Sequence, residues 1–357
     1  MSSIGLVKAE KRALIDKHAR PDNFKGSIQI LNTVVPIAAL WMAIAYAPSY
    51  SLIAGLTVLL ALLLVRVFAL MHDAGHGSLL RGRKLNQIAG FFLGVIAGMP
   101  QYVWSQHHAF HHATNGNWAK YRGPFAVITV EEYAKLTEAQ RRSYRRARHI
   151  LMLPLAGFMY LLFNPRYTWL KGSLQLVAHL LRGGKRADFK TRYWATGAEY
   201  RHMTWNNLVL LPSWVAMSWA IGPALFFSVY VASVSAAAAI GIILFTVQHN
   251  FEDSYASGHE GWDYDTAAVE GTSFLVLPRW LNWFTADIAY HHIHHISATI
   301  PNYRLAACHG EYEHLFRDVR RLRLADIPAA LECILWDEHS RTIVSVARLE
   351  RRGLQPA

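Results

Sequence analysis

Cysteine is almost absent from this sequence, which has only Cys308 and Cys333 among 357 residues. Two cysteines this far apart form neither a zinc knuckle nor a haem attachment motif, and they cannot make the disulfide framework of a small secreted protein. Charge is scarce as well, because only 17% of the residues are Asp, Glu, Lys or Arg, against about 25% in an average soluble domain. Together with a hydrophobic content of 53%, this shortage indicates a membrane protein.

Features that would divide or export the chain are also missing. Residues 1–23 are charged and have no apolar core, so we expect no cleaved signal peptide. No Gly/Ser-rich or Pro-rich linker and no internal repeat interrupts the sequence, which predicts one domain over residues 1–357. The excess of 36 Lys and Arg over 24 Asp and Glu fits the positive-inside rule of membrane proteins better than nucleic acid binding. We therefore expect no nucleic acid partner.

Two long stretches, residues 26–65 and 207–247, contain no charged side chain. Each has about 40 residues and would be about 60 Å long as one helix, roughly twice the ~30 Å hydrocarbon core of a bilayer. Each is therefore predicted to be a hairpin of two spanning helices, with turns near Pro48 and at Gly222. The four predicted spans are residues 28–47, 51–71, 205–221 and 224–247.

Neither predicted turn contains Lys or Arg, so both should lie outside the cell. Residues 72–204 and 248–357, with both termini, would then form a cytoplasmic helical cap on an all-α integral membrane protein, which we expect in a bacterial cytoplasmic membrane. The shorter apolar stretches at 88–100 and 150–163 are interpreted as interfacial or re-entrant helices. If 88–100 crossed instead, a membrane would separate the histidines described next. Arg66, inside a predicted span, is expected to extend to the lipid headgroups.

Histidine is abundant, with 19 residues, and many of them are grouped. His72 and His76 are spaced i, i+4, and the stretches 108–112 and 291–295 each place histidines at i, i+3 and i+4. These spacings put the imidazoles on one helix face, where neutral rings bind metal ions. Together with His249 these groups supply nine histidines, whereas one zinc ion binds at most four ligands. The number therefore predicts two metal ions, most simply iron. The predicted ligands are His72, His76, His108, His111, His112, His249, His291, His294 and His295.

Two further histidines adjoin these groups. His107 and His292 each lie one residue away from the first histidine of a triplet, so they point about 100° away on a helix. They are interpreted as residues that support the ligands or face an electron donor.

The sequence around the histidines resembles the three histidine boxes of the integral-membrane fatty acid desaturases. The matching strings are HDAGHGS, WSQHHAFHHATN and FTADIAYHHIHHISATIPNYRL. The resemblance covers about residues 30–310 and is strongest to the acyl-lipid branch with the Δ12 (omega-6) enzymes, above all in IPNYRL. It implies a non-haem di-iron centre held by the predicted ligands, with O2 as co-substrate.

Some positions depart from the family pattern. Ala74 stands where many relatives have Cys, and Ala286-Asp287 stands where they often have Gly-Asn. Asp287 precedes His291 by one turn, which predicts that its carboxylate orients that imidazole. Phe245 lies one turn before His249, where the acyl-CoA branch has an Asn thought to hold a water on iron.

The resemblance implies O2-dependent removal of two hydrogens from a lipid-linked acyl chain, giving a cis double bond, with Δ12 favoured. Side-chain acids and bases cannot activate such a CH2–CH2 pair. The sequence contains no dinucleotide-binding motif, cytochrome b5 segment or ferredoxin cysteine cluster, so electrons should come from a separate ferredoxin-like or cytochrome b5-like protein. The basic stretches 141–148 and 317–323 are candidate docking surfaces, although the first could instead contact anionic lipids.

Two alternatives remain open at this point. A di-iron membrane hydroxylase or carotenoid ketolase would use the same histidines and differ only after the first hydrogen is removed. A membrane metal-binding or transport protein would need ionisable residues along its spans, and the predicted hairpins have none apart from Arg66.

Overall fold

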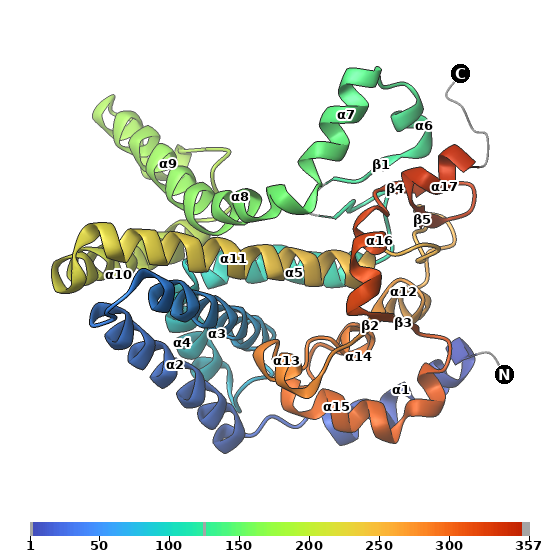
Figure 1. Ribbon diagram of the computed structural model, residues 1–357. Helices are drawn as coiled ribbons and strands as arrows, with labels where there is room; N and C mark the ends of the chain where they lie inside the picture. The colour runs from blue at the N-terminus through green and yellow to red at the C-terminus, as the bar shows by residue number, and fades with distance from the viewer. Residues whose placement is uncertain (1–2, 124–125, 352–357) are drawn as a thin grey trace.

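The computed structural model describes residues 3–123 and 126–351, most of which form helices. Long helices fill one half of the molecule, and short helices and strands form a cap on the other half (Figure 1). The long helices are α2 (Asn23–Ala45), α3 (Tyr50–His76), α9 (Asn164–Leu181), α10 (Gly197–Ile221) and α11 (Pro223–His249).

The chain reverses direction where the sequence predicts a turn in both long uncharged stretches. Helix α2 begins at Asp22, whose side chain accepts a hydrogen bond from the Lys25 N–H, and α3 begins in the same way at Ser49. Between α10 and α11 the chain turns at Gly222, whose φ of 88° suits glycine. Pro223 then starts α11, as proline does at first helical positions. Residues that favour helix starts and turns therefore set where the helices of both hairpins begin.

Three helices of the described chain are long and apolar enough to cross a membrane, namely α2, α3 and α11. The number rises to five if two bent helix pairs each count as one span. Helix α10, predicted as a span over residues 205–221, is not among them, and its sequence contains Asn206, Asn207 and Pro212. The two bent pairs are α4 (Arg83–Ala97) with α5 (Gln101–Thr114), and α7 (Glu138–Ala147) with a continuous helical segment over residues 150–181.

Helices α4 and α5 meet at 103°, so α5 turns back toward the cap after α4 ends at Gly98. Arg166, at the start of α9, holds this turn. Its guanidinium donates to the carbonyl oxygens of Gly98 and Leu161, and to the side-chain oxygens of Asn206 at 2.7 Å and Asn207 at 3.1 Å. One partly buried cation thus joins α4, α9 and α10, and fixes where α5 begins.

Arg66 does not reach the lipid headgroups, so that prediction is wrong. Only 2% of its surface is exposed. Its Nε donates to Thr33 Oγ1 at 3.0 Å, its Nη1 donates to the Trp283 carbonyl, and its guanidinium lies 4.1 Å from the centre of the Trp283 ring. The charge is satisfied inside the protein, where it connects α3 to α2 and to the cap.

The cap contains strands, so the fold is mostly helical rather than all-α. The strands are β1 Ile128–Thr129, β2 Ser273–Val276, β3 Arg320–Arg323, β4 Leu335–Asp337 and β5 Thr342–Val344. Strand β1 pairs in parallel with β4, β4 pairs antiparallel with β5, and β2 pairs in parallel with β3. These strands are too short to show an alternating pattern in the sequence.

The remaining helices are short, apart from the N-terminal one. Helix α1 packs on the cap, where Val7 and Leu14 join a buried cluster with Ile293 and Phe316. The bounds are α1 Ser3–His18, α6 Val130–Ala134, α8 Leu153–Phe158, α12 Tyr264–Val269, α13 Arg279–Phe284, α14 His291–Ile296, α15 Asn302–Glu311, α16 Ile327–Leu331 and α17 Val346–Arg351. A 3-10 turn, Ile150–Met152, precedes α8, and a π-helical turn, Met159–Phe163, connects α8 to α9.

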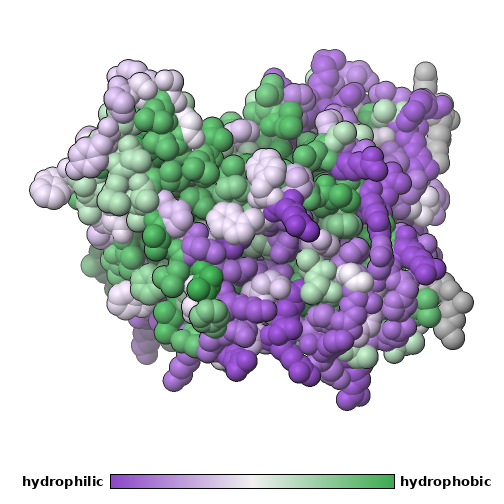
Figure 2. All heavy atoms as spheres, turned by 60° about the horizontal axis from the view of Figure 1, so that its bottom comes forward, coloured by the Kyte–Doolittle hydropathy of each residue, from purple (hydrophilic) through white to green (hydrophobic). Residues whose placement is uncertain are grey.

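The surface differs between the two halves. Hydrophobic side chains gather over the end that holds the long helices, and hydrophilic ones gather over the cap (Figure 2). Large apolar side chains are exposed on α2, α3 and α10, among them Leu31, Val35, Val58, Val215 and Trp219. This division is typical of a protein whose helical half is covered by lipid.

Candidate metal centre

The histidines predicted as metal ligands come from four elements and meet at the junction of the long helices and the cap. They lie at the end of α3, along α5, at the end of α11 and on α14. They form two groups, and within each group the ligand nitrogens all lie within 4.8 Å of one another. One group is His72, His76, His108, His112 and His294, and the other is His111, His249, His291 and His295. This convergence excludes the topology in which a membrane separates the histidines of α5 from the rest.

The closest ring nitrogens within each group lie about 3 Å apart. In the five-histidine group, His112 Nε2 lies 3.0 Å from both His108 Nε2 and His294 Nε2. In the other group, His291 Nε2 lies 2.9 Å from His249 Nε2 and 3.0 Å from His295 Nε2. For a metal–imidazole bond of about 2.1 Å, two nitrogens on one ion lie about 3.0 Å apart at a right angle and about 3.4 Å apart at a tetrahedral angle. The closest nitrogens in each group are therefore near enough to bind one metal ion.

The protonation state of the rings also fits metal binding. Burial, followed by repulsion from neighbouring imidazoles, holds the pKa of His294 and of His295 well below the usual value. Neutral imidazole is the form that binds a metal. The buried His76 Nε2 and His111 Nε2 have no hydrogen-bond partner among the described residues, and unpaired buried polar atoms are costly. A metal ion in each group would satisfy both atoms.

Asp73 supports the centre, and the sequence analysis did not identify it. Its carboxylate is buried, with Oδ1 3.1 Å from His72 Nδ1 and Oδ2 accepting the Asn302 N–H at 2.8 Å. A carboxylate on the outer nitrogen of a ligand imidazole fixes its tautomer and orientation. The only signal in the sequence was an acidic residue inside the first histidine motif.

Asp287 does not contact His291 as predicted. His291 Nδ1 has no hydrogen-bond partner among the described residues, and the Asp287 carboxylate interacts with the charge of Arg66 instead. Burial raises the pKa of Asp287 to about 6, and Arg66 opposes the rise. Ala286 and Asp287 have φ values of 48° and 55°, a left-handed conformation that favours Gly and Asn. The turn therefore directs Asp287 away from the predicted partner, and explains why Gly-Asn suits these positions.

His107 and His292 lie outside both groups of histidines. His107 is exposed on α5. His292 is buried, with Nε2 3.0 Å from His309 Nδ1 and its ring against Phe274 and Phe316. Among the described residues, no hydrogen bond joins either ring to a predicted ligand, which does not agree with a role in supporting the ligands. A role in facing an electron donor stays a prediction.

Two aromatic side chains border the centre. The Trp104 ring stacks on His108 with centroids 4.5 Å apart. The Phe245 ring lies 5.0 Å from the rings of both His111 and His249. Each group of histidines is therefore bordered by one aromatic ring.

Comparison with known proteins gives a consistent result. The model of a family described as fatty acid desaturase matches residues 49–324, a range that includes both groups of histidines. The chain is 34% identical to a fatty acid desaturase of Bacillus subtilis (strain 168), covering 92% of this chain and 87% of the relative. It is 25% identical to a probable fatty acid desaturase of Sorghum bicolor, covering 82% and 72%, and 25% identical to a chloroplastic omega-3 fatty acid desaturase of Glycine max, covering 83% and 62%.

Proposed function

The chain belongs to the fatty acid desaturase family, and on that premise we propose that it introduces a cis double bond into an acyl chain esterified to a membrane lipid. The proposed position is Δ12 of an 18-carbon monoene. The observation that carries the proposal is the convergence of the predicted ligands into a group of five and a group of four histidines. The motif IPNYRL after the third histidine group supports the acyl-lipid branch and the Δ12 position.

We propose that each group holds one iron ion and that O2 is the co-substrate. When bound, iron would activate O2, which is the oxidant for an unactivated C–H bond that side chains cannot attack. The chain supplies the environment. Asp73 keeps the His72 proton on Nδ1, so that Nε2 faces the group, while Trp104 and Phe245 exclude water from the rings.

Expression of the full chain in a host without polyunsaturated lipids tests this function. Lipids extracted from that host should gain a diunsaturated 18-carbon chain, detected by chromatography with mass spectrometric localisation of the double bond. A hydroxyl or keto group on the chain would instead favour a di-iron hydroxylase or ketolase. A new double bond at Δ9 of a saturated chain, or at the omega-3 position named for several relatives, would support desaturation but contradict the proposed Δ12 position.

The proposed topology has two hairpins, α2–α3 and α10–α11, with the cap, the centre and both termini in the cytoplasm of a bacterium. We further propose that the chain acts as a single domain.

Cysteine labelling tests the proposed topology. The variants Ser51→Cys and Ala224→Cys, next to the two turns, should react with an impermeant maleimide in intact cells. Ser143→Cys, exposed on α7, reacts only after permeabilisation. The native Cys308 and Cys333 are buried and give little background. Labelling of Ser143→Cys in intact cells would contradict this topology.

We propose that electrons arrive from a separate acidic protein of the ferredoxin or cytochrome b5 type, docked on residues 317–323. Arg317, Arg320, Arg321 and Arg323 are exposed there. Strand β3 pairs with β2, and β2 packs against α14, which carries three of the predicted ligands. Strand β2 and helix α14 therefore connect this surface to the candidate metal centre.

A further inference from the structure

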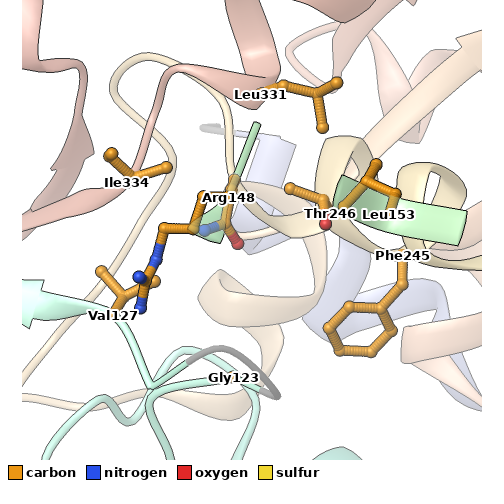
Figure 3. Close-up of a pocket in the computed structure, with 9 residues that line it drawn as sticks. Gly123, Val127, Arg148, Leu153, Phe245, Thr246, Leu331 and Ile334 are labelled. Carbon is orange, nitrogen blue, oxygen red and sulfur yellow. The ribbon is translucent and has the colours of Figure 1, made fainter. Parts of the chain in front are cut away.

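A small cavity adjoins the four-histidine group on the side of α8 and α16. It measures about 30 Å³ and is lined mainly by apolar side chains, including Val127, Leu153, Phe245, Leu331 and Ile334. In Figure 3 these side chains surround the cavity together with Arg148 and Thr246. Phe245 is both a wall of the cavity and a neighbour of the His111 and His249 rings, at 5.0 Å from each. One aromatic side chain thus separates the cavity from the candidate metal centre.

The cavity lies next to a larger groove on the surface. This groove measures about 380 Å³ and shares Arg148, Leu331 and Ile334 with the cavity. The two hollows are therefore neighbours on either side of these three side chains. The cavity beside Phe245 is the smaller one, and it is about one water molecule in size.

The lining of the groove combines basic and apolar side chains. Arg145, Arg146 and His149 are basic, and Leu151 and Met152 are apolar. Glu332 is the one acidic side chain among the described residues that line it. The charge of the groove is therefore positive, and an anion with an apolar tail matches both kinds of side chain.

The helical segment that supplies Leu151 and Met152 to the groove carries further exposed apolar side chains. Leu151 is 74% exposed and Leu155 is 60% exposed, and further along the same bent helical segment Leu170 and Leu174 are also exposed. A bilayer would cover this row of side chains, whereas water would not favour it. The groove therefore lies where basic cap and apolar helix meet, at the level expected for lipid headgroups.

We infer that this groove binds the phosphate of a membrane phospholipid, and that its acyl chain passes between Leu153 and Leu331 to reach Phe245. The inference rests on the proposed function, because it supplies the lipid-linked substrate to the same centre. Arginine binds phosphate through paired hydrogen bonds, and within the described residues the Glu350 carboxylate, at 3.8 Å, is the only ionic partner of Arg145. Phe245 moves aside to admit the chain and limits how deeply it enters.

Photo-crosslinking tests the path without requiring turnover. The probe is a phosphatidylglycerol with a diazirine in its acyl chain, incorporated with the full chain into lipid nanodiscs. After irradiation, mass spectrometry should find the label on Leu331, Ile334 or Leu153. The variant Arg145→Gln/Arg146→Gln should reduce this labelling about 10-fold and raise the KM for lipid by a similar factor, with kcat unchanged.

A matched control separates specific binding from general attraction to an anionic membrane, which is worth about 1 kcal/mol per basic residue. Arg83→Gln/Lys84→Gln removes the same charge from the exposed start of α4 and should leave the labelling and KM unchanged. Equal effects of the two double variants would overturn the inference, as would labelling confined to other residues. Labelling of the groove by a diazirine acyl-CoA but not by the phospholipid would also overturn it.

A variant of Phe245 tests the inner end. Phe245→Trp adds bulk beside the cavity and should lower turnover at least 10-fold, while the iron content and the labelling of Leu331 persist. Normal turnover of this variant would show that the acyl chain does not pass Phe245. Because desaturation by the unaltered chain is measured independently, failure of the path leaves the proposed function standing.

Discussion

Replacing His294 with alanine is expected to lower double-bond formation by more than about 100-fold, since loss of a group that merely supports a metal ligand already costs 10–100-fold. His294 Nε2 lies 3.0 Å from His112 Nε2 at the centre of the five-histidine group. The variant should still insert into the membrane, because α14 lies in the cap. The same loss is expected for alanine at each of the other predicted ligands.

The measurement combines product analysis with the iron content of the purified protein. His294→Ala should retain less iron than the unaltered chain. His107→Ala is the matched control, because this residue is exposed on the neighbouring helix α5, and it should keep both iron and activity. His292→Ala removes a buried ring that contacts His309 and Phe316, so it should lower thermal stability more than iron content. Full activity of His294→Ala would reject the proposed ligand set.

The grouping of the histidines could be predicted because it depends on local geometry. Histidines three and four residues apart must share a helix face, and His72, His108 and His291 each begin such a set. The turns of the hairpins were predictable for a similar reason, because breaks such as Pro48 and Gly222 lie near the middle of the uncharged stretches. Helical phase also predicted that His107 and His292 point away from the ligands.

The residues that hold the centre in place could not be predicted, because their partners are distant in sequence. Asp73 binds a backbone N–H that is 229 residues away, and Arg166 binds the turn at Gly98, 68 residues away. Arg66 is satisfied by Trp283, which no periodicity connects to it. The predicted contact between Asp287 and His291 was wrong because it assumed helical spacing between them. The backbone at Asp287 is left-handed, with a φ of 55°, so the two residues do not share a helix.

The second large effect is expected at Asp73. Asp73→Asn keeps the size of the side chain and removes its charge, so the hydrogen bond at His72 Nδ1 weakens and the imidazole loses its preferred tautomer. Iron affinity should fall 10–100-fold, the range found when such supporting carboxylates are lost. The affinity is measured by competition with a graded series of chelators in the detergent-solubilised full chain.

Rescue by iron distinguishes this role from that of a ligand. Excess ferrous iron should restore most of the activity of Asp73→Asn, because every coordinating nitrogen is still present, but should not restore that of His294→Ala. Asp73 also accepts the N–H of Asn302, so part of its effect could be structural. If Asp73→Asn lowered only the thermal stability and bound iron like the unaltered chain, its carboxylate would serve to fasten α15 to α3. A loss of iron affinity at unchanged thermal stability would instead place its main role at His72.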